Sequence, residues 1–181
     1  MFSITPSTIQ GCFEIVFKRL DDNRGYFTKT FHKIMYKELG VHFEFGEEYF
    51  SMSAQNVFRG LHFQIPPKAI DKIIFCAYGA VTDYVADIRK GSPTYGQWAS
   101  FELNSERPSA VFVPKGLAHG FFTRSEKALM QCKSSDVFDT GCDKAVSYKS
   151  FSLKEQIPNP ILSEKDITAP LLQHFDSPFS F

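Results

Sequence analysis

Short apolar stretches in which alternate residues share a face recur through most of the chain, and they limit its possible folds more than any other feature. Turn-forming residues separate them, so that predicted strands follow one another every ~8–12 residues with few helical patterns between. The predicted strands span residues 11–19, 26–32, 42–52, 57–64, 72–77, 81–88, 97–103, 109–114, 121–123 and 128–134. This spacing is typical of an all-β sandwich or barrel, and we expect one domain over residues 1–181.

Two short helices are expected beside the strands. Residues 33–39 have the best early helical pattern, and Gly40 directly after them is a common helix stop. Near the C-terminus, Ser163 and Asp166 have the spacing of a capping box, which predicts that a short helix begins there. On pattern alone, the expected role of Asp166 is therefore that of a helix cap.

Composition excludes several classes of protein. The 20 basic and 20 acidic residues balance at a pI near 7.0, which gives no indication of a nucleic-acid partner. The 4 cysteines form no CxxC pair or zinc-binding spacing, so we expect reduced thiols. The first ten residues lack the pattern of a signal peptide, and no apolar run approaches the ~18 residues of a membrane span. We expect a soluble cytoplasmic protein without a membrane partner.

The segment 56–72 carries the residues best suited to chemistry. His62 lies in a predicted strand, and Arg59 lies three residues before it. Side chains alternate along a flat strand, so these two would point to opposite faces. They could serve one site if a bulge at Gly60 re-aimed one of them, or if Arg59 belonged to another pocket wall. The plain alternative is that His62 is a packed or surface histidine.

Lys72 is an isolated cation at the start of an apolar strand, where it needs a partner. Residues 72–77 and 81–88 are predicted to pair as a hairpin around a Tyr-Gly turn. Asp83 and Asp87 would lie across that hairpin from Lys72 and could supply the partner. The alternative is an ordinary salt bridge at the rim of the sheet.

A metal centre is not expected. His119 lies between Gly116 and Gly120, but neither it nor His62 has the neighbouring histidine and carboxylate of a metal-binding barrel. The sequence contains no serine nucleophile elbow, P-loop or GxGxxG pattern either. A pocket with histidine, lysine, arginine and aspartate, and without metal or cofactor, suits proton abstraction beside a carbonyl. Lysine would stabilise the enolate, and arginine would bind a phosphate.

Five motifs in order resemble the sugar-nucleotide 3,5-epimerases of the dTDP-4-keto-6-deoxyglucose type, the RmlC group of cupins. The motifs are DDNRGYF at 21–27, VFRGLHFQ at 57–64, DYVADIRKGSPTYGQW at 83–98, VFVPKGLAHGF at 111–121 and PILSEKD at 160–166. The resemblance implies a double-stranded β-helix, the cupin jelly roll, with a few short helices. It also implies a homodimer that exchanges N-terminal strands, and an isomerase without metal or cofactor.

The resemblance implies roles for individual residues. His62 would be the base, oriented by Asp166, and Lys72 would face the developing enolate with Asp83 close by. The substrate would be a nucleotide-diphosphate 4-keto-6-deoxyhexose of deoxysugar and O-antigen-type biosynthesis, epimerised at C5, C3 or both. The expected substrate-binding residues are Arg59, His119, Arg24, Gln64, Glu47, Tyr49, Lys29 and Gln131.

The chain differs from the family at the residue that acts as the proton-donating acid. In the family a tyrosine on the face of the sugar opposite the histidine donates a proton, and that position aligns here with Gln131. A second family tyrosine aligns with Val137. An amide cannot act as the acid, so the acid is lost, replaced by water, or displaced to a residue such as Tyr49 or Tyr148. A single inverted centre is then expected, with C5 favoured.

A second departure concerns the nucleotide. Where the family carries a glutamate near the base, this chain has Thr28 or Lys29, and Glu47 and Tyr49 replace the usual glutamine and asparagine. Thymine N3 donates a hydrogen bond and suits a carboxylate, whereas cytosine N3 accepts one, so we expect CDP ahead of dTDP. Competing functions are a 3,4-ketoisomerase, a non-catalytic sugar-nucleotide binding protein and a metal-dependent cupin oxygenase.

Overall fold

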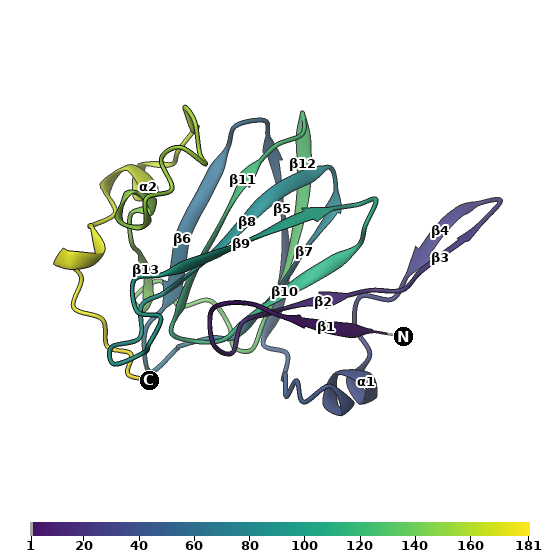
Figure 1. Ribbon diagram of the computed structural model, residues 1–181, viewed down its shortest axis with the longest axis horizontal. Helices are drawn as coiled ribbons and strands as arrows, with labels where there is room; N and C mark the ends of the chain where they lie inside the picture. Colours follow the sequence, from purple (N-terminus) through teal and green to yellow (C-terminus); the bar gives the residue numbers. More distant parts are fainter. Residues whose placement is uncertain (1) are drawn as a thin grey trace.

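Two β-sheets pack face to face in the computed structural model, which describes residues 2–181 (Figure 1). The six-stranded sheet has the order β1 (Ser3–Pro6), β2 (Phe13–Val16), β10 (Ser109–Val113), β7 (Lys72–Tyr78), β12 (Lys127–Ser134) and β5 (Glu47–Ala54). The five-stranded sheet has the order β13 (Asp143–Ala145), β6 (Phe58–Gln64), β11 (Leu117–Thr123), β8 (Ala80–Asp87) and β9 (Trp98–Asn104). Neighbouring strands in both sheets run antiparallel.

The remaining elements are short. A two-stranded hairpin of β3 (Arg19–Asp22) and β4 (Gly25–Thr28) projects from the sheets, and helix α1 (Lys33–Glu38) follows it (Figure 1). The C-terminal part carries α2 (Glu164–Thr168) and the 3₁₀ turns η1 (Tyr148–Phe151) and η2 (Leu172–His174). No helix in the described residues is both long enough and apolar enough to cross a membrane.

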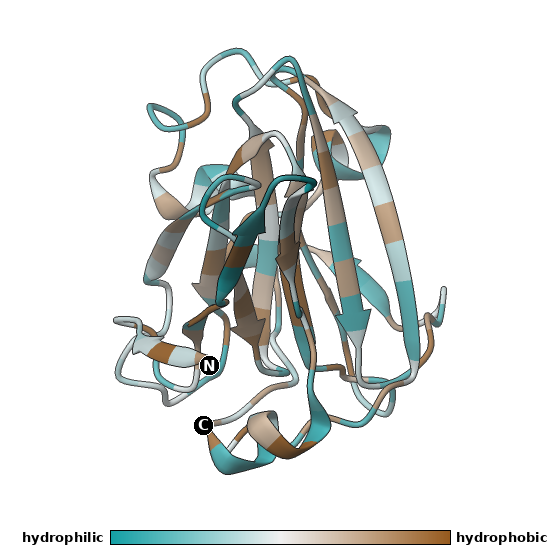
Figure 2. Ribbon diagram, turned by 90° about the vertical axis from the view of Figure 1, so that its right-hand side faces the viewer, coloured by the Kyte–Doolittle hydropathy of each residue, from teal (hydrophilic) through white to brown (hydrophobic). Residues whose placement is uncertain are grey.

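The central strands of both sheets are covered on both faces, which explains why several strands are continuously apolar. One core lies between the sheets, and Val85, Val111 and Phe121 belong to it. The C-terminal segment packs a second core on the five-stranded sheet, and the N-terminal strands with α1 pack a third on the six-stranded sheet. Apolar bands therefore recur along the strands of both sheets (Figure 2). A strand buried on both faces loses the polar half of its alternation.

The expected all-β jelly roll is confirmed, but the predicted hairpin of 72–77 and 81–88 is wrong. β7 and β8 lie in different sheets, so the chain crosses from one sheet to the other at Gly79 instead of folding back beside itself. Gly79 has φ +80°, and a Cβ there would lie 2.1 Å from the Lys127 carbonyl oxygen. Only glycine fits so close a backbone approach.

The strand boundaries differ from the predictions chiefly at the N-terminal end. The pattern at 26–32 ends as a strand at Thr28, and residues 19–22 form the separate strand β3, which pairs with β4. The pattern at 42–52 becomes a strand only from Glu47. The short strands β1 and β13 carry too few residues for alternation to show. The two expected helices are present as α1 and α2.

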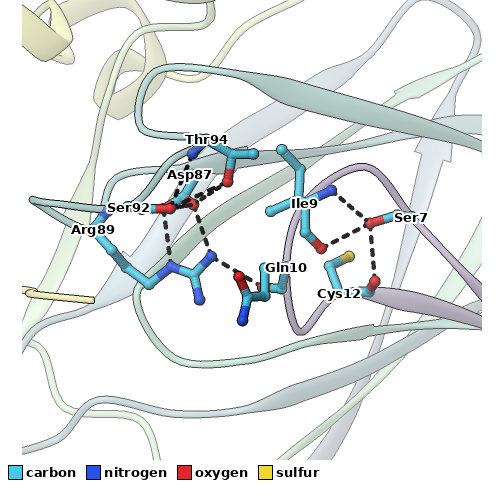
Figure 3. Close-up of polar contacts among 8 residues, drawn as sticks. All are labelled: Ser7, Ile9, Gln10, Cys12, Asp87, Arg89, Ser92 and Thr94. Carbon is cyan, nitrogen blue, oxygen red and sulfur yellow. Dashed lines mark hydrogen bonds and ion pairs between the residues drawn. The ribbon is translucent and has the colours of Figure 1, made fainter.

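Asp87 is not a partner of Lys72 but the centre of a structural polar network (Figure 3). Its buried carboxylate accepts hydrogen bonds from Arg89 Nε at 3.0 Å, Ser92 Oγ at 2.6 Å and Thr94 Oγ1 at 2.7 Å. Arg89 also donates to the carbonyl oxygen of Gln10 at 3.0 Å. The network fixes the loop between β8 and β9 and ties it to the N-terminal turn.

Candidate active site

A cavity of about 500 Å³ opens between the two sheets. Strands β6 and β11 of the five-stranded sheet form one wall, and β5, β7 and β12 of the six-stranded sheet form the other. The predicted site residues that line it are Glu47, Tyr49, Arg59, His62, Gln64, Lys72 and His119. Residues far apart in sequence thus meet in one space because the jelly roll stacks their strands face to face.

A β-bulge on β6 brings Arg59 and His62 to the same cavity. His62 pairs with His119 and Arg59 pairs with Phe121, so the interval of three residues on β6 faces an interval of two on β11. An extra residue in one strand reverses the alternation locally. The bulge anticipated at Gly60 is therefore present, and Gly60 has φ +147°.

Glycines allow the two backbones to meet at the bulge. A Cβ on Gly60 would lie 2.5 Å from the Cα of Gly120, and a Cβ on Gly120 would lie 2.6 Å from the carbonyl oxygen of Arg59. Both distances are far below van der Waals contact. The RGLH and AHGF segments of the sequence thus have their glycines where β6 and β11 approach most closely.

His62 and Asp166 form a hydrogen-bonded pair at the cavity wall. The distance from His62 Nε2 to Asp166 Oδ1 is 2.5 Å, and the Asp166 side chain is only 1% exposed. When Nε2–H donates to the carboxylate, the lone pair of the imidazole lies on Nδ1. Burial lowers the pKa of His62 below its ordinary 6.5, although Asp166 opposes that change. At neutral pH His62 is therefore an uncharged imidazole whose tautomer is fixed by Asp166.

Asp166 combines the two roles that the sequence left as alternatives. Ser163 is the N-cap of α2, and its Oγ accepts a hydrogen bond from the Asp166 backbone N–H at 3.3 Å. The same hydroxyl donates to Asp166 Oδ2 at 2.7 Å. Burial alone would raise the pKa of Asp166, but hydrogen bonds from His62, Ser163 and the Gly60 N–H lower it. The carboxylate therefore stays ionised beside His62.

Lys72 is a buried cation whose charge is largely uncompensated. Its residue is 9% exposed, and within residues 2–181 its ammonium hydrogen-bonds only to the His62 carbonyl oxygen, at 3.5 Å. Burial lowers the pKa of Lys72 below 10.5, although the nearby Asp83 and Asp143 oppose that change. A desolvated ammonium facing a cavity interacts strongly with an anionic ligand.

Asp83 pairs with His119 and lies near Lys72. Its Oδ2 is 2.7 Å from His119 Nε2, and its Oδ1 has no hydrogen-bond partner in the described part of the chain. Burial raises the pKa of Asp83, and His119 and Lys72 oppose that rise. The pair fixes the ring of His119, which lines the cavity. The expected closeness of Asp83 to Lys72 is thus present without a direct ion pair.

Two further expected residues have defined positions. Arg59 is exposed towards the cavity, and its Nε donates to Ser53 Oγ at 3.0 Å, which leaves the outer guanidinium nitrogens for a ligand. Gln64 also lines the cavity, but its amide holds backbone groups, donating to Lys68 O at 2.8 Å and accepting from Asp139 N at 2.6 Å. Gln64 therefore shapes the cavity wall chiefly by fixing loops.

Arg24 and Lys29 do not reach the cavity of their own chain. Arg24 lies at the tip of the β3–β4 hairpin with its side chain 85% exposed, paired with Asp22 at 2.6 Å. Lys29 directly follows β4 and is exposed. The expectation that both bind substrate is not met within one chain, because the hairpin projects away from the sheets (Figure 1).

Gln131 does not line the cavity, so the expectation that it contacts substrate there is not met. Along β12, Met130 and Cys132 face the cavity, whereas Gln131 points to the other side and bonds Glu48. Val137 is likewise outside the cavity, and Phe138 lines it. The residues that β12 presents to the cavity are therefore Met130 and Cys132.

Sequence reasoning missed an ion pair at the cavity wall. Lys165 of α2 bonds Asp143 of β13, and both residues line the cavity. Lys165 lies in the quoted ILSEKD motif, but nothing local in the sequence links it to β13. Among the described residues no group of three or more His, Cys, Asp or Glu side chains is arranged to hold a metal ion.

Comparison with known proteins gives the same family as the motifs. The model of the dTDP-4-dehydrorhamnose 3,5-epimerase family matches residues 6–174. The dTDP-4-dehydrorhamnose 3,5-epimerase of Salmonella typhimurium is 37% identical over 159 residues, covering 86% of this chain and 87% of that protein. The dTDP-4-dehydrorhamnose 3-epimerase of Streptomyces niveus is 34% identical over 172 residues, covering 93% of this chain and 83% of that protein.

Solved structures agree with these relatives. The Legionella pneumophila dTDP-6-deoxy-D-glucose-3,5-epimerase, in complex with dTDP-4-keto-L-rhamnose, superposes with a TM-score of 0.92 at 33% identity, covering 97% of this chain and 95% of that chain. NovW, a 4-keto-6-deoxy sugar epimerase of Streptomyces spheroides, superposes with a TM-score of 0.90 at 31% identity, covering 96% and 88%. The chain therefore belongs to the dTDP-4-dehydrorhamnose 3,5-epimerase family and is a sugar-nucleotide epimerase with the cupin jelly-roll fold.

Proposed function

We propose that the chain inverts one or both stereocentres beside the ketone of a nucleotide-diphosphate 4-keto-6-deoxyhexose, with His62 as the base. The observation that carries the proposal is the pair of His62 and Asp166 beside the cation of Lys72 in one cavity. A neutral histidine of fixed tautomer can remove a proton from carbon next to a carbonyl. The relatives named above as 4-keto-sugar epimerases support this substrate class.

Lys72 stabilises the enolate in this proposal. When the carbon loses its proton, negative charge develops on the ketone oxygen, and a desolvated ammonium lowers the energy of that charge most strongly where water is excluded. Asp83 and His119 hold the surrounding wall, and Arg59 presents its free guanidinium nitrogens to the diphosphate. The reaction moves only protons, and these side chains supply the base and the charge stabilisation without a metal or cofactor.

The experiment is proton exchange in D₂O followed by NMR. Incubation with 4-keto-6-deoxyhexoses linked to different nucleotides is expected to give deuterium at each inverted carbon, which identifies C3, C5 or both. Inversion at both carbons would contradict single-centre action. A product with the carbonyl moved to C3 would identify a ketoisomerase instead. Tight binding without exchange would identify a non-catalytic binding protein.

CDP is the proposed nucleotide. Cytosine N3 accepts a hydrogen bond, and the resemblance aligns Thr28 or Lys29 with the family's carboxylate, which suits the N3–H of thymine. The relatives and the Legionella structure carry dTDP in their names, so a preference for CDP would distinguish this chain from them. Isothermal titration with CDP, dTDP, UDP and GDP is expected to rank CDP first, and a clear preference for dTDP would contradict this part of the proposal.

A homodimer completes the site in this proposal. Leu20, Tyr26 and Phe27 on the projecting hairpin are 49%, 43% and 60% exposed. Apolar side chains gathered on a two-stranded hairpin need a partner surface, since an isolated hairpin is marginal in water. A second copy of the chain would cover them and would bring Arg24 and Lys29 to the cavity of its partner.

A further inference from the structure

Two neighbouring strands place Tyr49 beside Cys132 on one wall of the cavity. β5 and β12 pair antiparallel over eight residue pairs, and in that register Tyr49 lies directly opposite Cys132. Both side chains line the cavity. Directly opposed residues in an antiparallel pair have their Cβ atoms ~5 Å apart on the same face, so the tyrosine ring extends over the short cysteine side chain.

This wall faces the one that carries His62. Tyr49 and Cys132 belong to the six-stranded sheet, whereas His62 belongs to the five-stranded sheet. A sugar ring bound between the sheets therefore meets His62 on one face and Tyr49 on the other. Inversion at carbon needs this arrangement, because the proton must return on the face opposite the one from which it left.

Tyr49 suits the role of acid better than Cys132 does. Burial raises the pKa of the Tyr49 phenol and of the Cys132 thiol, so both keep their protons at neutral pH, and their reach and donor strength decide between them. A phenol O–H is a full hydrogen-bond donor that reaches into the cavity, whereas a thiol is a weak one. The Cys132 side chain is short and buried, and its thiol donates a weak hydrogen bond to the Lys133 carbonyl oxygen, with an S···O distance of 3.8 Å.

We propose that Tyr49 of β5 is the catalytic acid of this epimerase, displaced by one strand from the position that Cys132 occupies. The inference rests on the function proposed above. His62 takes the proton from carbon, and the electrons of that C–H bond form the enolate beside Lys72. The O–H bond of Tyr49 then breaks as a C–H bond forms on the opposite face and the ketone is restored. The phenolate and the imidazolium return to their starting forms by proton exchange with water.

The test separates exchange from inversion in D₂O. Tyr49→Phe keeps the ring and removes only the hydroxyl, with Tyr95→Phe as a matched control on an exposed tyrosine outside the cavity. Wild type and Tyr95→Phe are expected to incorporate deuterium with inversion. Tyr49→Phe is expected to invert at least ~10²-fold more slowly, the usual contribution of a general acid. It should still incorporate deuterium with retention, because His62 returns a solvent deuteron to the same face.

A rescue variant distinguishes a chemical role from a structural one. In Tyr49→Phe/Cys132→Tyr the phenol returns from the neighbouring strand, and inversion is expected to recover at least ~10-fold over Tyr49→Phe. Inversion at the wild-type rate in Tyr49→Phe would overturn the assignment, as would loss of inversion in Cys132→Ala alone, which would make the thiol the acid. Absence of exchange in wild type with every 4-keto sugar nucleotide would refute the proposed function itself.

Discussion

His62 combines two opposing influences on its charge. Burial in the cavity wall disfavours the imidazolium, and the carboxylate of Asp166 at 2.5 Å favours it, with burial the stronger of the two. The result is an imidazole that is neutral at physiological pH, and Asp166 offsets part of the cost of charging it. An imidazole that is already neutral at physiological pH is available to accept a proton, as the proposed base must be.

Replacing Asp166 with Asn should slow the reaction while preserving the fold. The amide has the same shape and can still pack beside Ser163, but it does not stabilise the imidazolium or select its tautomer. We expect kcat/KM for epimerisation to fall ~10²-fold or more. Steady-state kinetics and a thermal melt check this, and a variant with wild-type kcat/KM would contradict the role of the pair.

The pH profile should reflect the burial of His62 and Lys72. His62 must be neutral to accept a proton, so kcat/KM should rise with pH through a midpoint below 6.5. Lys72 must be charged, so kcat/KM should fall again through a midpoint below 10.5. Asp166→Asn removes an anion that favours the imidazolium, so its acidic limb should move to still lower pH. A shift of that limb to higher pH would contradict the account.

At the level of elements, the bulge in β6 decides which side chains share the cavity. Without the extra residue, Arg59 would lie on the face opposite His62. The segment also supplies the Gly60 N–H to the carboxylate of Asp166, so the backbone of β6 contributes to the charge of the pair. The bulged strand β6 therefore positions the proposed base His62, the Gly60 N–H that supports Asp166, and the arginine proposed to bind phosphate.

Gly60→Ala should destabilise the protein and misplace His62. The new Cβ would lie 2.5 Å from the Gly120 Cα. The alanine would also have to adopt φ +147°, which L-residues rarely do. We expect a loss of about 2 kcal/mol or more in the free energy of unfolding. Gly91→Ala is the control, since Gly91 also has positive φ but open space around it. Equal losses in the two variants by urea denaturation would show that the close approach carries no cost.

Sequence patterns located most strands but not their partners. Lys72 and Asp83 were expected across one hairpin, yet their strands lie in different sheets, because a tight turn and a crossing between sheets have similar sequences at Gly79. In β12, alternation was ambiguous because Leu129 and Met130 offer an apolar residue on each face, and Lys133 is buried. Gln131 was placed in the cavity by alignment with the family's tyrosine, and because a shift of one residue exchanges the faces of a strand, Cys132 lines the cavity instead.

At the scale of the whole molecule, the contact of His62 with Asp166 joins residues 104 positions apart, and no local pattern predicts it. The family resemblance implied it, since five motifs carry the fold with them. The resemblance also implied a dimer that exchanges N-terminal strands, but local patterns alone do not predict that the hairpin bearing Arg24 and Lys29 projects away from its own chain's cavity.

Replacing Leu20 and Phe27 with Ser should separate the proposed dimer without unfolding the chain. These side chains lie on the hairpin outside the described apolar cores, so the melting temperature of the isolated chain should change little. Light scattering should give twice the 20.6 kDa chain mass for wild type and 20.6 kDa for the variant. Tyr78→Ser, which removes an exposed aromatic elsewhere, is the control. If the wild-type protein were a fully active monomer, the proposal that a second chain completes the active site would be contradicted.

The most direct test of the central claim follows solvent deuterium in His62→Ala and wild type with the same 4-keto-6-deoxyhexose nucleotide. By NMR, wild type should incorporate deuterium at the inverted carbon. His62→Ala should lose that exchange by ~10²-fold or more, because the general base is gone, while its melting temperature stays close to that of wild type. Exchange in His62→Ala at the wild-type rate would show that another group removes the proton and would contradict the assignment of His62 as the base.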